Sequence, residues 1–258
     1  MKNTSKNTSY FNKLARGFSL IEMAIVLIIL GFVLSALILP LQAQRQQLFQ
    51  SQTENTLETA KKALLGFAQS KGRLPCPATA NGLEAPLGGT ACTSQLGYLP
   101  AVTLGIQPTD SNGFAVDAWN NRIMYAVTQS PTIATPDFTT NNATNGISIV
   151  GITNLTPDLR ICKSSVGMTA DACSGGAEAN YFVNNAVAVI YSLGPTGSQA
   201  SGGNDENVNP NAPTNPKKMF VSHDVTAAGV ANGEFDHILV WISPFVLYNA
   251  MIEAGQLH

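Results

Sequence analysis

The stretch Gly17–Leu41, GFSLIEMAIVLIILGFVLSALILPL, is the most apolar part of this 258-residue chain, and it predicts a long apolar helix near the N-terminus. It contains one charged residue, Glu22, and no other charge lies between Phe18 and Gln44. About 20 apolar residues form a helix long enough to cross roughly 30 Å of hydrocarbon. A carboxylate at membrane depth costs roughly 2.5–3.5 kcal/mol on insertion scales, so we expect Glu22 to have a positively charged partner.

A short basic leader precedes this stretch. Residues 1–17 contain no acidic residue and four basic ones, Lys2, Lys6, Lys13 and Arg16. The apolar run is longer than the roughly 7–15 residues of a secretory signal, and no small-residue cleavage site closes it. By the positive-inside rule, the N-terminus stays in the cytoplasm and the rest lies outside. A single-pass membrane anchor accounts for all of this except Glu22.

The residues around Glu22 offer an explanation for it. The run Gly17-Phe18-Ser19-Leu20-Ile21-Glu22 after a basic leader resembles the class III signal of type IV pilins and type II secretion pseudopilins. The resemblance implies that a prepilin peptidase cuts between Gly17 and Phe18, and that Phe18 becomes the N-methylated first residue. It also implies that Glu22 pairs with the amine of Phe18 on a neighbouring subunit. The alternative explanation for Glu22 is structural: a carboxylate near a helix start gains from the helix dipole and can reach the membrane surface by snorkelling.

The sequence divides into four expected segments: a cleaved leader (1–17), a membrane-spanning and filament-core helix (18–41), its amphipathic continuation (42–72) and an extracytoplasmic globular head (73–258). The continuation carries one apolar stripe at helical spacing, formed by Leu57, Ala60, Leu64, Phe67 and Ala68. Gly72 is expected to end the helix. Gly31 and Pro40 interrupt the apolar half, and because proline removes a helical hydrogen bond, local melting between them on assembly is a hypothesis.

The head is expected to be a single α+β domain, with an antiparallel sheet laid on the long helix. After Arg73, short apolar strings alternate with turn residues. Five of these strings predict strands: Arg122–Thr128, Gly146–Gly151, Ala186–Ser192, Met219–Ser222 and His237–Ile242. The residues from Pro244 onward predict a short closing helix.

Composition favours a loop-rich extracytoplasmic domain. Only 12% of residues are charged, whereas 45% are hydrophobic. Without the leader, ten basic residues face 16 acidic ones, a formal charge of −6. A mildly acidic body argues against a nucleic-acid site built on net charge, because such sites need clustered lysine and arginine.

The four cysteines form two local couples, Cys76 with Cys92 and Cys162 with Cys173. Neither couple has the spacing of a zinc or redox motif. Outside the cytoplasm, two disulfides that close short loops are the simplest reading. Four cysteines allow three connectivities, of which this nearest-neighbour pairing is favoured.

Two stretches of the head extend the resemblance to pseudopilins. The run Asp117–Tyr125, DAWNNRIMY, is similar to their D-x-W-G-N-x-x-x-Y segment, with Asn120 in place of glycine. The run Tyr191–Gly197, YSLGPTG, is similar to their Y-S-x-G-x-D-G turn, with Thr196 in place of aspartate. The corresponding loop of pseudopilins binds calcium, which implies the ligands Leu193 (through its carbonyl), Asn204, Asp205, Glu206 and Asn207. A hydrated polar turn without metal is the alternative.

Catalytic signals are weak. Ser222-His223-Asp224 has the residue types of a hydrolytic triad, but adjacent residues on a strand point to opposite faces. No phosphate-binding or dinucleotide motif is present, and we expect no enzyme activity.

The resemblance implies a structural subunit, minor or specialised, of a type IV pilus or a type II secretion pseudopilus. The long polar loops of the head favour a minor subunit, the calcium-loop similarity favours a pseudopilin, and the two disulfides favour a pilin. Implied partners are the prepilin peptidase, other subunits, and an inner-membrane assembly platform with its ATPase. The subunit would wait at the inner membrane, head in the periplasm, before it joins the filament. The alternative is a non-polymerising, membrane-anchored extracytoplasmic adhesin or binding protein.

Overall fold

A computed structural model describes residues 17–89, 91–128, 131–132, 135–197, 202–213 and 217–257, without the side chains of 36–41, 131–132 and 135–136. The chain divides into two compact units, Met1–Gln47 and Leu48–His258. The leader cations predicted above, Lys2, Lys6, Lys13 and Arg16, lie outside the described residues.

The first element is the helix α1 (Leu20–Lys71), which continues past the boundary between the units. It ends where predicted, because Gly72 adopts a left-handed conformation (φ 69°) and its N–H binds the carbonyl of Ala68 at 2.8 Å. Within the second unit, four members of the predicted apolar stripe are fully buried: Leu57, Ala60, Leu64 and Ala68. Phe67 is half-buried under the guanidinium of Arg73.

A four-stranded antiparallel sheet forms the centre of the second unit, in the order β1 (Leu96–Tyr98), β2 (Met124–Val127), β7 (Ala188–Ser192) and β9 (Ile238–Ile242). Its side chains alternate between two cores, as the two-residue period of a strand requires. Tyr125 and Ile190 pack with the buried stripe of α1 and with the helix α4 (Pro244–Glu253). Met124 and Tyr191 face the opposite core.

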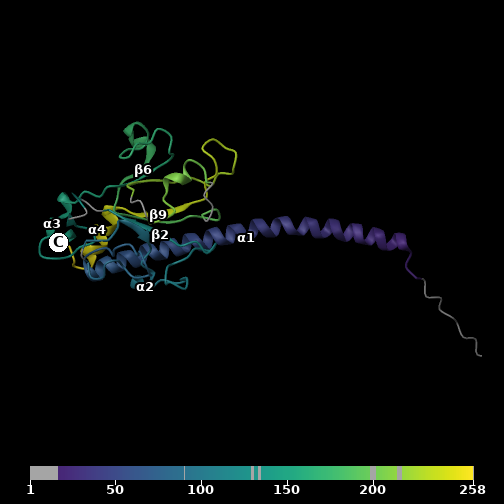
Figure 1. Ribbon diagram of the computed structural model, residues 1–258, viewed down its shortest axis with the longest axis horizontal. Coiled ribbons are helices and arrows are strands. Elements are labelled where there is room, and N and C mark those ends of the chain that lie inside the picture. The colour runs from purple at the N-terminus through teal and green to yellow at the C-terminus, as the bar shows by residue number, and fades with distance from the viewer. Residues whose placement is uncertain are drawn as a thin grey trace, which may run out of the picture. The chain divides into compact units, whose positions relative to one another are not determined.

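A second sheet covers that opposite face. It has three strands, in the order β6 (Tyr181–Ala186), β5 (Leu159–Cys162) and β8 (Met219–Val221), and β5 runs parallel to β8. Figure 1 shows α4 and the blue part of α1 on one side of β2 and β9, with β6 on the other side. The head is therefore built from three layers: helices, a central sheet and an outer sheet.

The remaining described elements are short. They are the helices α2 (Ala101–Leu104) and α3 (Ile147–Val150), the paired strands β3 (Pro131–Thr132) and β4 (Thr135–Pro136), and the 3-10 turns Ile152–Asn154, Ser174–Gly176, Glu178–Asn180 and Glu206–Val208.

The α+β fold class is confirmed, with corrections in detail. The predicted strands over Arg122–Thr128, Ala186–Ser192, Met219–Ser222 and His237–Ile242 correspond to β2, β7, β8 and β9. The predicted strand Gly146–Gly151 is wrong, because these residues form α3. Four residues are too few to show a usable periodicity, and Gly146 and Gly151, both with positive φ, turn the chain at the two ends of α3. Strands β5 and β6 were not predicted, and neither was the separate outer sheet that they form with β8.

Candidate functional site

The start of α1 is closed by reciprocal hydrogen bonds between Ser19 and Glu22. The N–H of Glu22 donates to Ser19 Oγ at 3.2 Å, and the N–H of Ser19 donates to Glu22 Oε2 at 3.3 Å. This is a capping box, in which the residue before the helix and the third helical residue satisfy each other's free N–H groups. The carboxylate also lies at the positive end of the helix dipole. Glu22 is therefore held at the helix start, next to the predicted new N-terminus at Phe18.

The apolar side chains that follow are exposed. Phe18 is 80%, Ile21 70% and Leu27 64% exposed, and all residues from Gly17 to Ser35 are exposed. Contiguous apolar surface of this extent is unusual in a protein that functions alone. Covering it with other molecules would be strongly favourable, because removing apolar surface from water drives association.

The helix is continuous through Gly31 and Pro40 in this isolated chain. Melting on assembly therefore stays a hypothesis about the filament. In the described part of the chain, no helix has the length and hydropathy needed to cross a bilayer, so the membrane span predicted for residues 18–41 is not confirmed.

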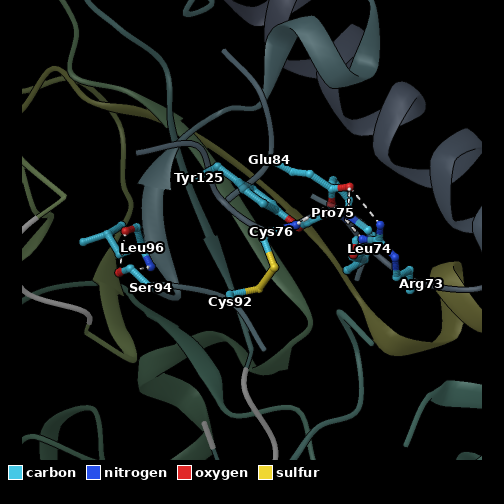
Figure 2. The surroundings of a disulfide bond; sticks show 10 residues. Arg73, Leu74, Pro75, Cys76, Glu84, Cys92, Ser94, Leu96 and Tyr125 are labelled. Atoms are coloured by element: carbon cyan, nitrogen blue, oxygen red, sulfur yellow. Dashed lines mark hydrogen bonds and ion pairs between the residues drawn. A yellow bond between two sulfur atoms is a disulfide. The ribbon is translucent and has the colours of Figure 1, made fainter. Parts of the chain in front are cut away.

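A buried ion pair and the first disulfide lie directly after the end of α1. Arg73 Nη1 and Nη2 each donate to a carboxylate oxygen of Glu84 at 2.8 Å, as Figure 2 shows. Cys76, bonded to Cys92, donates its N–H to the same carboxylate at 3.3 Å. Burial alone would raise the pKa of Glu84, but the hydrogen bonds and charge of Arg73 outweigh it and lower that pKa. The ion pair and the disulfide therefore hold the segment that follows α1 in place within the second unit.

Both disulfides have the predicted nearest-neighbour pairing. The second joins Cys162, at the end of β5, to Cys173. All four cysteine side chains are buried.

The two head stretches that resemble pseudopilins lie against each other. Asp117 accepts the N–H groups of Trp119 and Asn121, and it accepts the hydroxyl of Ser192 at 2.5 Å. The amide of Asn121 donates to the carbonyl of Gly194 at 2.6 Å. Burial raises the pKa of Asp117 despite these hydrogen bonds. Hydrogen bonds thus join the stretch from Asp117 to Tyr125 to the stretch from Tyr191 to Gly197.

Asn120 explains one departure from the resemblance. Its φ is 68°, in the left-handed region that glycine occupies most easily and asparagine tolerates better than most residues. Asparagine can therefore occupy this left-handed position of the turn where the resembling segment has glycine.

The predicted calcium ligands at 204–207 do not converge on one point. Asn204 and Asn207 are exposed, and the Asn207 amide donates to the Gly202 carbonyl. Asp205 is buried but bound elsewhere: it accepts the N–H of Ser165 at 2.6 Å and contacts His223 Nε2 at 3.1 Å.

Leu193 and Glu206 are buried, and of the predicted set only Glu206 faces a second carboxylate. That carboxylate is Asp236, two residues before β9, and it was not among the predicted ligands. Its only sequence signal is an acidic residue where a loop meets a predicted strand.

The comparisons with known proteins identify the N-terminal region. Residues 12–38 match the family model described as the prokaryotic N-terminal methylation motif. No curated protein and no solved structure matches the chain. The matched residues contain Gly17, Phe18, Ser19 and Glu22, the residues that begin the exposed apolar helix and its capping box. The chain carries the N-terminal methylation signal of type IV pilin and pseudopilin precursors.

Proposed function

We propose that this protein is a structural subunit, of the minor or specialised kind, of a type IV pilus or a type II secretion pseudopilus. The observation that carries the proposal is the exposed apolar helix start from Phe18 to Ser35, all of which lies within the matched methylation motif. The motif points to a structural family, and we assign the chain no catalytic role.

Processing precedes assembly in this proposal. The prepilin peptidase cuts between Gly17 and Phe18, removes the basic leader and leaves a methylated amine on Phe18. Gly17 lies outside the helix and is exposed, so a peptidase can reach the bond after it. The apolar helix keeps the subunit at the inner membrane, with its head in the periplasm, until an assembly platform and its ATPase add it to the filament.

Glu22 has a different partner before and after assembly. In the isolated chain its carboxylate accepts the N–H of Ser19. In the filament it pairs with the Phe18 amine of a neighbouring subunit. Leaving either charge unpaired in a water-poor core would cost several kcal/mol, so the pair would fix the register between subunits.

The decisive experiment separates the charge of Glu22 from its capping role. Glutamine can serve in a capping box as glutamate does, so Glu22→Gln preserves the helix start and removes the charge. We expect this variant to be cleaved and methylated at Phe18 but not incorporated into filaments. Mass spectrometry of the mature N-terminus and filament fractionation measure the two steps.

Glu54→Gln is the matched control, because Glu54 is an exposed glutamate of the same helix. It should be processed and incorporated like the unaltered protein. Normal incorporation of Glu22→Gln would refute the role of its charge between subunits. Absence of the unaltered protein from filaments would refute the proposal and favour a membrane-anchored adhesin or binding protein that does not polymerise.

A further inference from the structure

A pocket of about 610 Å³ lies beside strand β8, in the outer sheet of the head. Its lining comes from residues 168–171, residues 204–208 and residues 217–219, the last of which include the start of β8. The volume is within the range of roughly 300–1,000 Å³ that ligand pockets occupy. We call this the β8 pocket, and the proposed assembly through α1 makes no use of it.

Each wall of the β8 pocket is held by bonds within the head. The disulfide between Cys162 and Cys173 closes the loop that contains residues 168–171. In the second wall, the N–H of Asn204 donates to the carbonyl of Asn232 at 2.7 Å. Pairing of β8 with β5 holds the third wall. The pocket is therefore formed before anything binds in it, which lowers the entropic cost of binding.

The pocket has an apolar part that adjoins the hydrophobic core. Met219 is buried in the core between the two sheets, and Met168 and Val208 pack against that core. Methionine side chains are unbranched and polarizable, so they adapt to apolar groups of different shapes. Because removing apolar surface from water is favourable, this part of the pocket suits an apolar side chain of a ligand.

One side of β8 has no neighbouring strand. The strand lies at the edge of the outer sheet, and its other side bonds to β5: the N–H of Arg160 donates to the carbonyl of Lys218 at 2.7 Å. Backbone groups of successive residues alternate between the two sides of a strand, so those of Met219 and Val221 face away from β5. Unpaired backbone groups at a sheet edge are a template for an added strand.

The side chain of Asn209 already pairs with part of this edge. Its Oδ1 accepts the N–H of Val221 at 2.8 Å, and its Nδ2 donates to the carbonyl of Val221 at 2.9 Å. The amide thus takes the place of a peptide group in a neighbouring strand. Two residues earlier, the N–H and the carbonyl of Met219 have no hydrogen bond to any residue that the structure describes. Met219 lines the pocket, so its backbone groups can pair with a peptide bound there.

A lysine of the pocket lining supplies a positive charge. Lys217 is exposed, and its Nζ donates to the carbonyl of Val208 at 3.4 Å. Within the described ranges no acidic group pairs with Lys217, whereas Lys218 pairs with Asp158 at 3.0 Å. The acidic residue of the lining, Asp171, lies on the disulfide-closed loop. A carboxylate of a ligand would therefore bind at Lys217, on the β8 wall.

We infer that the β8 pocket binds the extended C-terminal end of a peptide whose last residue is apolar. The peptide backbone pairs with Met219, the apolar side chain contacts Met168 and Val208, and the terminal carboxylate pairs with Lys217. This is strand addition, in which main-chain hydrogen bonds supply affinity and pockets for side chains supply specificity. The inference concerns only the head, so it does not depend on whether the chain assembles into filaments.

The test is a calorimetric titration of the purified full-length chain, in detergent, with three acetylated tetrapeptides. Each peptide has alanines followed by a last leucine, phenylalanine or methionine with a free carboxylate. We expect saturable binding of at least one peptide. Its amidated form should bind about fivefold more weakly, because an exposed ion pair contributes modestly. The form with methylated backbone nitrogens should not bind, because it cannot donate hydrogen bonds to β8.

Two variants place the binding in the pocket. Lys217→Gln should remove the difference between the free and the amidated peptide. Ala170→Trp fills the pocket from an exposed position, so it should abolish binding while the melting temperature stays the same.

Matched controls lie outside the pocket lining. Ala177→Trp changes an exposed alanine, and Lys163→Gln changes an exposed lysine that donates to a backbone carbonyl, so both should bind like the unaltered protein. The inference is overturned if none of the three free peptides binds, or if the amidated or methylated form binds equally well. It is also overturned if Lys217→Gln keeps the difference between peptides, or if Ala170→Trp binds normally.

Discussion

Leu27 and Leu64 are leucines of one helix in opposite environments. Leu64 is fully buried against the central sheet, whereas Leu27 is 64% exposed. The part of α1 from Leu48 onward has an apolar stripe that its own head covers. The stretch from Leu20 to Leu41 is apolar on all sides except for Glu22 and Ser35. A helix that is apolar all round needs surroundings other than water. The first half thus depends on other molecules, and the second on the fold of its own chain.

The largest expected effect concerns the first half. Glu22→Gln should abolish incorporation into filaments while the head unfolds as before, because the proposed partner of the charge lies on a neighbouring subunit and Glu22 lies outside the head. Filament fractionation gives the first result. Urea unfolding followed by the fluorescence of Trp119 and Trp241, both in the head, gives the second. A change in head stability would contradict the separation of the two regions.

Paired leucine substitutions test the comparison directly. Leu64→Ala should lower the free energy of unfolding of the head by about 3 kcal/mol, because it leaves a cavity in a packed core. Leu27→Ala should leave that free energy unchanged within about 0.5 kcal/mol. The same urea titration measures both. Equal effects at the two positions would show that the apolar half is covered in the isolated chain.

Buried and exposed ion pairs can be compared in the same way. Glu84→Gln leaves Arg73 buried without its partner and should cost about 3 kcal/mol of unfolding free energy. Glu58→Gln removes an exposed pair with Lys61 and should cost less than about 0.5 kcal/mol.

The Glu84 contribution also has a defined pH dependence. The pKa of Glu84 is lowered on folding, from an ordinary value of 4.5, despite the opposing effect of burial. Its stabilisation is therefore fully present above pH 4.5 and is lost as the pH falls through the lower folded value. Urea titrations across this range should show a shallower loss for Glu84→Gln. An unchanged acid profile would mean that other groups dominate.

The smallest expected effect is at the turn of Asn120. Asn120→Gly should change the free energy of unfolding by only a few tenths of a kcal/mol, whereas Asn120→Ala should lower it by about 1 kcal/mol, because alanine is strained at a φ of 68°. Melting temperatures of the two variants give the comparison. A stabilising Asn120→Ala would show that the turn changes shape.

Local patterns were sufficient for much of this fold. The stripe from Leu57 to Ala68 follows helical periodicity, so its burial could be predicted. The cysteine couples were close enough in sequence to favour one pairing. Strands β2, β7, β8 and β9 are apolar runs bounded by turn residues, and they were found for that reason.

Other features had no local signal. Residues 146–151 are too short to show a period, and the strand predicted there is a helix. β5 and β8 are parallel neighbours separated by more than fifty residues in sequence, so no hairpin turn in the sequence indicates that they pair. The predicted calcium set failed to converge because neighbouring side chains of a loop need not point the same way: Asp205 turns to Ser165, and Glu206 turns to Asp236.

The sequence by itself determined the helix, its processing signal and the unusual carboxylate at Glu22, because these depend on residues within a few positions of one another. Only the tertiary structure decided that the second half of α1 is covered while the first stays exposed, and that Glu206 meets Asp236. Burial and long-range contact depend on how loops and sheets meet in space, which no short stretch of sequence encodes.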